Sequence, residues 1–458
     1  MSLLIKNGNI ITAVDNYKAD IFIEDSKISI IGKHLDIEAD TIIDAKDKFI
    51  FPGGIDPHVH LDLPFKNTTS SDNFETGTLA ALYGGTTTVI DFATQYKGES
   101  LYTAVNNWKI KAEGNAYSDY AFHLAISELN DNTMSELESV ILNEGITSFK
   151  VYMAYKDTLM IDDAQIIALM EIAKKYNCIV LAHATNGHII NYLVSKFKWE
   201  GKLATLYHYL SQPAITEAEA TGRFSDLAYI TGARSYIVHL SCEEALNKIR
   251  EVTKRNQKVY AETCIQYLLL DYSLYEQAAD AIKWIISPPL REKKDQQALW
   301  AAINQGLIQT VATDHCPFLM KDKKVGEKDF SQVPNGMPGI ENRVELLFSE
   351  GVKKGKITIN KFVELISTNA AKIFGLFPQK GNITVGADAD LVVFAPDEKH
   401  VISAKTHHMN CDYSCYEGLE VTGKCKTVIL RGKIAIHDNE VYINKGFGKY
   451  IKRYHPMI

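Results

Sequence analysis

Six residues with metal-binding or cationic side chains stand at or near the ends of short apolar runs: His58, His60, Lys150, His183, His239 and Asp314. His58 and His60 are two positions apart, so in a strand both imidazoles face the same side. Asp314 follows a buried-looking run, where a carboxylate is costly unless it is paired, protonated or metal-bound. One such histidine is more often a satisfied core residue, but the combination favours a zinc site, because zinc accepts imidazole and carboxylate ligands.

Lys150 differs from the other five because an unmodified lysine cannot bridge two cations. A single zinc ion would need only the histidines and Asp314. A site with two ions needs a bridging anion, and a lysine carbamylated by carbon dioxide would supply a carboxylate. The alternative is a structural lysine that pairs with a buried carboxylate. The residues alone leave both interpretations of Lys150 open.

The strands that carry these side chains must end at one place if the residues are to act together. Strand-like apolar runs occur at 54–60, 86–92, 120–126, 147–152, 178–184, 235–240, 258–263 and 309–314. Helical periodicity fills intervals between them, including 162–176, 243–256 and 294–305. Eight repeats of strand and helix predict an α/β fold with a parallel (β/α)8 barrel of the TIM type. Active sites of such barrels lie at the carboxyl ends of the strands, which is where the candidates fall.

Both ends of the chain look different from its middle. Short β-like runs occur at 3–11, 20–23, 28–31, 41–44, 389–394 and 426–434, and Asn7-Gly8 is a hairpin signal. Neither end is long enough to form a sandwich alone. We therefore expect residues 1–51 and 376–445 to form a small composite β-sandwich domain. Residues 52–375 would form the metal-binding barrel and residues 446–458 a C-terminal tail.

The composition narrows the range of partners and locations. The chain has 458 residues, 46% of them hydrophobic, and a net charge of −7. With no basic block, this charge argues against nucleic-acid binding. The sequence contains neither a long apolar span nor a signal peptide, which predicts no membrane partner and a cytoplasmic protein. The seven cysteines lack a paired framework and are expected to be reduced thiols.

Longer motifs surround the candidate residues and extend over nearly the whole chain. They are DPHVHLDLPF at 56–65, GGTTTVIDF at 84–92, SFKVYMAY at 148–155, SPPLR at 287–291, TDHCPF at 313–318, PNGMPG at 334–339 and DYSCYEG at 412–418. These motifs resemble those of the dihydropyrimidinase and hydantoinase branch of the amidohydrolase superfamily. The resemblance implies a homotetrameric hydrolase with two zinc ions per subunit and no organic cofactor. It also implies that Lys150 is carbamylated, as N6-carboxylysine.

The resemblance assigns a role to each metal ligand. His58, His60 and Asp314 would complete the coordination of one zinc ion, and His183 and His239 that of the other. The Lys150 carbamate would bridge the two ions. This arrangement would lower the pKa of a shared hydroxide and direct it at a carbonyl carbon.

The activity implied is opening of the cyclic amide bond in dihydropyrimidines and 5-substituted hydantoins, which yields N-carbamoyl amino acids. Attack by the bridging hydroxide would be assisted by Asp314, which moves the proton to the leaving nitrogen, and by Tyr155, which stabilises the oxyanion. Ser287 and Asn335 match positions whose backbone groups hold the cyclic imide. Four further side chains are expected either to form a wall around the ring substituent or merely to pack their loops: Leu63, Phe65, Tyr152 and Leu159.

Three other classes of protein in the same superfamily compete with this interpretation. Dihydroorotases typically carry a basic residue two positions after the second histidine, and Asp62 occupies that position here, which argues against an acidic substrate. Allantoinases share the His-x-His motif and stay an alternative. Collapsin response mediator proteins keep the fold as scaffolds but have lost metal ligands, whereas all six ligand positions are filled here.

Overall fold

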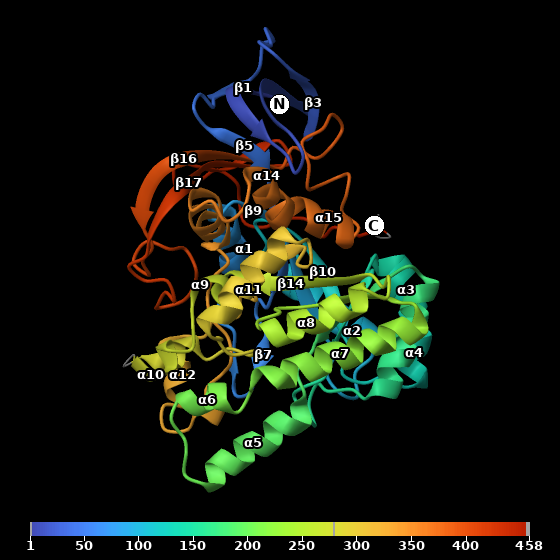
Figure 1. Cartoon of the computed structure of the whole chain (residues 1–458). Helices are drawn as coiled ribbons and strands as arrows, with labels where there is room; N and C mark the ends of the chain where they lie inside the picture. The colour runs from blue at the N-terminus through green and yellow to red at the C-terminus, as the bar shows by residue number, and fades with distance from the viewer. Residues whose placement is uncertain (1, 278–279, 455–458) are drawn as a thin grey trace.

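Eight parallel strands form the predicted barrel in a computed structural model that describes residues 2–277 and 280–454 (Figure 1). The strands are β6 (Gly54–Val59), β9 (Thr86–Thr94), β10 (Asp119–Ala125), β11 (Ser148–Tyr152), β12 (Ile179–His183), β13 (Arg234–Ile237), β14 (Val259–Cys264) and β15 (Thr310–Ala312). They are hydrogen-bonded in this order from β6 to β15. A parallel bridge between Val59 and His315 brings the first and last strands together, so the barrel is nearly closed.

Amphipathic helices cover the outside of the barrel between successive strands. They include α1 (Phe74–Tyr83), α2 (Leu101–Ala112), α3 (Asp131–Glu144), α4 (Asp163–Lys175), α7 (Ala214–Thr231), α8 (Glu243–Thr253) and α11 (Lys293–Asn304). In α4, the buried residues Ile166, Leu169, Met170 and Ala173 follow the spacing of one helical face. The helices expected at 162–176, 243–256 and 294–305 are α4, α8 and α11.

The other elements of the barrel region lie mainly in the connections. They are β7 (Pro64–Phe65), β8 (Thr68–Thr69), α5 (Gly187–Trp199), α6 (Leu206–Leu210), α9 (Ile265–Leu269), α10 (Leu274–Gln277), α12 (Met320–Lys324), α13 (Arg343–Leu347), α14 (Ile359–Val363) and α15 (Asn369–Ile373). Short 3-10 turns occupy Ala281–Trp284 and Phe330–Gln332, and π-helical turns occupy Phe348–Lys353 and Glu364–Thr368. None of the helices in the described part of the chain is long and apolar enough to cross a membrane.

The two ends of the chain build one separate sheet, as expected (Figure 1). The N-terminal end supplies β1 (Ser2–Ile11), β2 (Asn16–Glu24), β3 (Lys27–Gly32), β4 (Thr41–Asp44) and β5 (Phe49–Pro52). The C-terminal end supplies β16 (Leu391–Val401), β17 (Glu420–Leu430), β18 (Lys433–His437) and β19 (Glu440–Val441). Antiparallel pairing of β5 with β16 joins the two halves. Aliphatic side chains from both ends fill the core of this sheet.

Two details expected in the chain ends are wrong. Asn7 and Gly8 do not form a hairpin, because β1 continues through them and pairs with β2 on both sides; Asn7, at φ 63°, lies at a break in the register. The run 426–434 is not one strand either. β17 ends at Leu430, Arg431 and Gly432 turn with positive φ, and β18 begins directly after them. Two residues with positive φ are the usual connection of a tight hairpin.

The last described residues run along the barrel. Tyr120 of β10 donates its backbone N–H to the Lys449 carbonyl at 3.0 Å and accepts one from Ile451 at 2.8 Å. The Tyr450 ring lies 5.3 Å from that of Phe122, measured between centroids. The stretch after residue 445 is therefore an extended strap on β10.

Candidate active site

Every site residue proposed from the sequence lines one small cavity of about 60 Å³. Its lining comes from the carboxyl ends of barrel strands and from the loops that follow them. Cys316 and Gly336, which the sequence analysis did not single out, line the same cavity. The candidate metal ligands and the candidate substrate contacts therefore face a common space.

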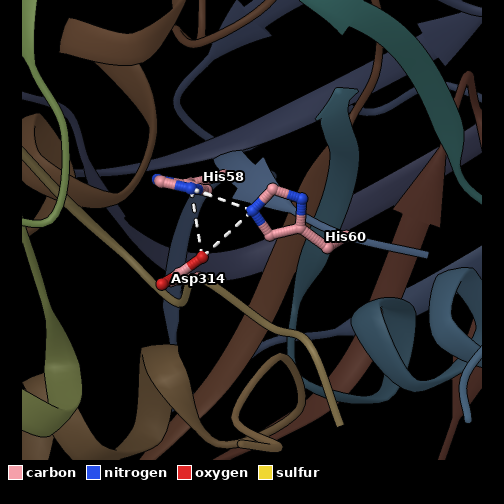
Figure 2. Close-up of side chains that lie close together, drawn as sticks. All are labelled: His58, His60 and Asp314. Atoms are coloured by element: carbon pink, nitrogen blue, oxygen red, sulfur yellow. Dashed lines mark hydrogen bonds and ion pairs between the residues drawn. The ribbon is translucent and has the colours of Figure 1, made fainter. Parts of the chain in front are cut away.

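Three ligand atoms converge at one side of this cavity (Figure 2). The Nε2 atoms of His58 and His60 are 3.3 Å apart. Asp314 Oδ1 lies 3.1 Å from Nε2 of His58 and 3.2 Å from Nε2 of His60. Two imidazoles and a carboxylate aimed at one point form a donor set that zinc accepts.

His183 and His239 form a second pair beside the first. His239 Nε2 lies 2.8 Å from Nδ1 of His183, and the ring centroids of His58 and His239 are 5.4 Å apart. Within the described residues, His183 Nε2 and His60 Nδ1 are buried and have no hydrogen-bond partner. His239 Nε2 and His183 Nδ1 are the atoms that a metal ion could join, because the ring nitrogens of neutral imidazoles are metal ligands.

Lys150 projects into the same cavity from β11 and is almost completely buried. Its Nζ lies 4.8 Å from the centroid of the Phe92 ring and 5.3 Å from that of Tyr152. Burial lowers the pKa of Lys150 to about 8, although the charges of Asp314 and Glu262 oppose the shift. The neutral amine that this pKa makes accessible is the form that can take up carbon dioxide.

Burial keeps most of the imidazoles neutral. It lowers the pKa of His60 to about 4 and holds the pKa values of His183 and His239 well below their usual range. Burial also tends to lower the pKa of His58. The carboxylates of Glu262 and Asp314 outweigh this effect and raise the pKa of His58 to about 9. Neutral imidazole is the form that binds metal ions.

Asp314 is an ionised carboxylate in this setting. Burial raises the pKa of its carboxyl group, but His58 and His60 outweigh burial and hold it well below its usual range. The side chain is 15% exposed, toward the cavity. An ionised, cavity-facing carboxylate can both bind a metal ion and accept a proton.

The buried carboxylate of Glu262 supports both histidine groups, and sequence reasoning missed it. His58 donates from Nδ1 to Glu262 Oε1 at 2.6 Å, and the backbone N–H of His239 donates to the same oxygen at 3.0 Å. Tyr236 donates its hydroxyl to Oε2 at 3.0 Å. Carboxylates of this kind fix the orientation and basicity of metal-ligating histidines. The available signal was a glutamate as the one charged residue of β14.

His315, next to Asp314, does not line the cavity. Its Nε2 lies 3.0 Å from Asp72 Oδ2, and its Nδ1 accepts the backbone N–H of Gly339 at 3.1 Å. His315 thereby connects the loops after β6 and β15 with the segment after Asn335.

Two of the expected strands extend too far. The runs 235–240 and 309–314 were expected to be strands throughout, but β13 ends at Ile237 and β15 at Ala312. Beyond these ends, His239 and Asp314 have left-handed backbones, with φ of 41° and 51°. Such conformations are uncommon for residues other than glycine and cluster at functional sites. Here they accompany side chains that line the cavity.

A larger cavity of about 730 Å³ adjoins the small one. The two share Phe65, Tyr155, Leu159, Ser287 and Asn335, whereas none of the six candidate ligands lines the larger cavity. The larger cavity is therefore the space through which a small molecule could reach the ligand cluster.

Tyr155 stands at the junction of the two cavities. Its ring centroid lies 5.2 Å from that of His183, and its backbone is left-handed at φ 58°. Burial raises the pKa of its phenol to about 12, although hydrogen bonding with Ser287 and Asn335 partly offsets the rise. At neutral pH the phenol is protonated and can donate a hydrogen bond.

Comparison with known proteins places the chain in a family. Residues 49–435 match the amidohydrolase family. The chain is 50% identical over 455 residues to a D-hydantoinase of Geobacillus stearothermophilus, covering 99% of this chain and 97% of that protein. It is 35% identical over 456 residues to a dihydropyrimidinase of Dictyostelium discoideum, covering 99% and 91%. The crystal structure of a dihydropyrimidinase from Brevibacillus agri NCHU1002 is 47% identical, with a TM-score of 0.98 and 99% of both chains covered. This chain therefore belongs to the amidohydrolase family, in the branch of the hydantoinases and dihydropyrimidinases.

Proposed function

We propose that this chain hydrolyses the cyclic amide bond of dihydropyrimidines and 5-substituted hydantoins and releases N-carbamoyl amino acids. The observation that carries the proposal is the convergence of six candidate ligands in one cavity beside Tyr155, Ser287 and Asn335. Relatives that match almost the whole chain are named D-hydantoinase and dihydropyrimidinase, which supports the same substrate class.

The donor set fits a pair of zinc ions. His58, His60 and Asp314 would hold one ion, and His183 and His239 the other, because each group already points its ligand atoms together. Lys150, as a carbamate, would supply the anion between them. Bound zinc would acidify a water molecule and polarise the carbonyl group of the substrate.

The residues of the chain would then move the proton and position the ring. Asp314 would accept a proton from the attacking water and return it to the ring nitrogen as the carbon–nitrogen bond breaks. Tyr155 would donate its hydroxyl hydrogen bond to the oxygen that gains negative charge. Ser287 and Asn335 would hold the cyclic imide through their backbone groups.

The ring substituent would lie against four apolar side chains that line the small cavity, two of which also line the larger one. Leu63 and Phe65 come from the loop after β6, and Tyr152 and Leu159 from the end of β11 and its loop. Phe65 and Tyr155 touch edge to face, with centroids 6.2 Å apart, so the two loops meet at this wall. An apolar wall suits an uncharged aliphatic or aromatic substituent.

The alternative substrates are distinguished by charge. Asp62 stands where a dihydroorotase would carry its basic residue, and it lines neither cavity. Allantoin stays an alternative that only assay decides.

We also propose that the protein is a cytoplasmic homotetramer. The homotetramer rests on the resemblance, and the cytoplasmic location on seven buried cysteines without disulfides.

A substrate panel on zinc-loaded protein tests the proposal. The panel contains hydantoin, an aryl-hydantoin, dihydrouracil, allantoin and dihydroorotate, with the N-carbamoyl product measured directly. We expect ring opening of the hydantoins and dihydrouracil, and kcat/KM values for the other two that are lower by about tenfold or more, the scale of one lost pocket contact. Preferred turnover of allantoin or dihydroorotate would overturn the assignment.

A further inference from the structure

Lys323 of helix α12 is buried, and none of the carboxylates among the described residues pairs with it. Its side chain has no exposed surface, whereas Lys324 of the same helix is exposed. Burial lowers the pKa of Lys323 to about 8, and the titratable groups that act on it are a cation, Lys66, and three thiols: Cys316, Cys411 and Cys415. Lysines are almost never buried this completely without a compensating partner. The compensation must come from other polar groups.

Two backbone carbonyls provide that compensation. Lys323 Nζ donates to the Ile285 carbonyl at 3.0 Å and to the Pro334 carbonyl at 3.2 Å. The backbone N–H of Gly336 also donates to the Ile285 carbonyl, at 3.0 Å. One ammonium group thus joins two segments that are almost 50 residues apart in the sequence.

These two segments carry the residues proposed to hold the substrate ring. Ser287 is two residues after Ile285, and Asn335 directly follows Pro334. Ser287 and Asn335 line both the cavity of the candidate ligands and the larger cavity beside it. The two carbonyl groups that accept hydrogen bonds from Lys323 therefore lie within two residues of both positions proposed to hold the ring.

The Asn335 segment has little freedom to adjust alone. Gly336 has φ 151°, and a Cβ atom there would lie 2.1 Å from the Cys316 carbonyl oxygen. On the other segment, Ser287 donates its hydroxyl to Gln212 Oε1 at 2.9 Å. Each segment is held on its own side, and they are joined to each other by the Gly336–Ile285 backbone hydrogen bond and by the two hydrogen bonds of Lys323.

We propose that Lys323 is a positioning residue that fixes Ser287 and Asn335 relative to each other and thereby governs binding of the substrate ring. The inference rests on the proposed function. Loss of the ammonium group should weaken binding of every substrate alike, because the ring is common to all and the substituent lies elsewhere. The metal ligands should be unaffected, because Lys323 donates to none of them.

The test compares Lys323→Met with Lys324→Met, which removes an exposed charge from the same helix. For each variant, zinc content, Tm, kcat and KM are measured with hydantoin and with an aryl-hydantoin. Small displacements of positioning groups can cost about 100-fold in rate, so we expect kcat/KM of Lys323→Met to fall by about 10- to 100-fold. The loss should appear mainly in KM, equally on both substrates, with zinc content unchanged. Lys324→Met should match the parent.

The outcomes separate this inference from the function on which it rests. A parent protein that opens no ring refutes the proposed function. An active parent with an unchanged KM in Lys323→Met refutes only the positioning role, even if Tm falls. If Lys323→Met does not fold, Lys323→Gln, which keeps one donor group, is measured instead. Failure of both variants to fold would assign Lys323 to stability alone and contradict the proposal.

Discussion

Lys150 carries the most specific chemical claim at the residue scale, because only its carbamate would supply an anion between two zinc ions. Lys150→Ala should lose much of its zinc and nearly all activity, while a small carboxylic acid added to the assay should restore part of it by filling the cavity. Zinc content and turnover are measured with and without propionate, and Lys175→Ala, an exposed lysine of α4, is the control. Full activity of Lys150→Ala would contradict the bridging role.

Glu262 should control metal affinity although it would touch no metal ion. Glu262→Gln keeps the size of the side chain but replaces the carboxyl acceptor of the His58 hydrogen bond with an amide. Loss of such a partner typically costs about 10- to 100-fold in metal affinity, which competition with a chelator measures. Tyr236→Phe, which leaves the bond to His58 in place, should cost less. Equal affinity of Glu262→Gln and the parent would show that Glu262 does not orient His58.

Individual residues differed in how far the sequence could predict them. The convergence of His58, His60 and Asp314 could be predicted, because imidazoles in a short repeat and a carboxylate after an apolar run are rare in a core. Glu262 could not, because its contact with His58 joins β14 to β6 across the barrel, and no local pattern encodes that distance. Lys323 was missed for the same reason, since its carbonyl partners are distant in sequence.

At the scale of the elements, the loops after β6 and β11 should decide which ring substituents are accepted. Leu63→Ala and Leu159→Ala each remove part of the apolar wall without touching a candidate ligand. The ratio of kcat/KM between an aryl-hydantoin and dihydrouracil should change by an amount worth about 1–3 kcal/mol. Leu142→Ala, on the exposed face of α3, is the control. An equal loss on all substrates would favour a role in loop packing.

The elements themselves were largely predictable, and their ends were not. Eight apolar runs identified the eight barrel strands, because parallel strands buried on both faces have continuous apolar sequences. The turn at Arg431 was missed because it lies inside an apolar run without an Asn-Gly or Asp-Gly pair. The ends of β13 and β15 were misplaced because His239 and Asp314 leave the strand through left-handed backbone, which side-chain patterns do not reveal.

At the scale of the whole molecule, a buried ionic cluster connects the barrel with the sheet of the chain ends. Lys380 Nζ lies 2.8 Å from Asp119 of β10 and 2.5 Å from Asp390, which directly precedes β16. Lys380 also reaches Asp388 at 3.3 Å, and the three carboxylates are buried. Arg431 of the hairpin turn completes the cluster through Asp119.

Lys380→Met should destabilise the fold, because it removes the buried cation that three buried carboxylates share. Removing one partner of a buried ion pair costs about 3–5 kcal/mol, which should appear as a lower Tm and a lower free energy of unfolding. Lys27→Met, which removes an exposed cation from the same Asp388, should cost at most about 1 kcal/mol. Equal effects of the two variants would contradict a connecting role for the cluster.

The division into domains stays a prediction at residues 51, 375 and 445. The β5–β16 pairing joins the two chain ends in one sheet, whereas the strap after residue 445 packs on β10 of the barrel. Those long-range contacts depend on the closed barrel, so local sequence patterns could not anticipate where the strap lies.

The most direct test of the central claim is zinc titration of the metal-stripped protein with ring opening of hydantoin as the readout. The chelated protein should be inactive, because the proposed nucleophile depends on bound metal. Activity should rise with added zinc and reach a plateau at two ions per chain, as counted by mass spectrometry of the metal. Full activity of the stripped protein, or a plateau at one ion per chain, would contradict the account of a two-zinc amidohydrolase.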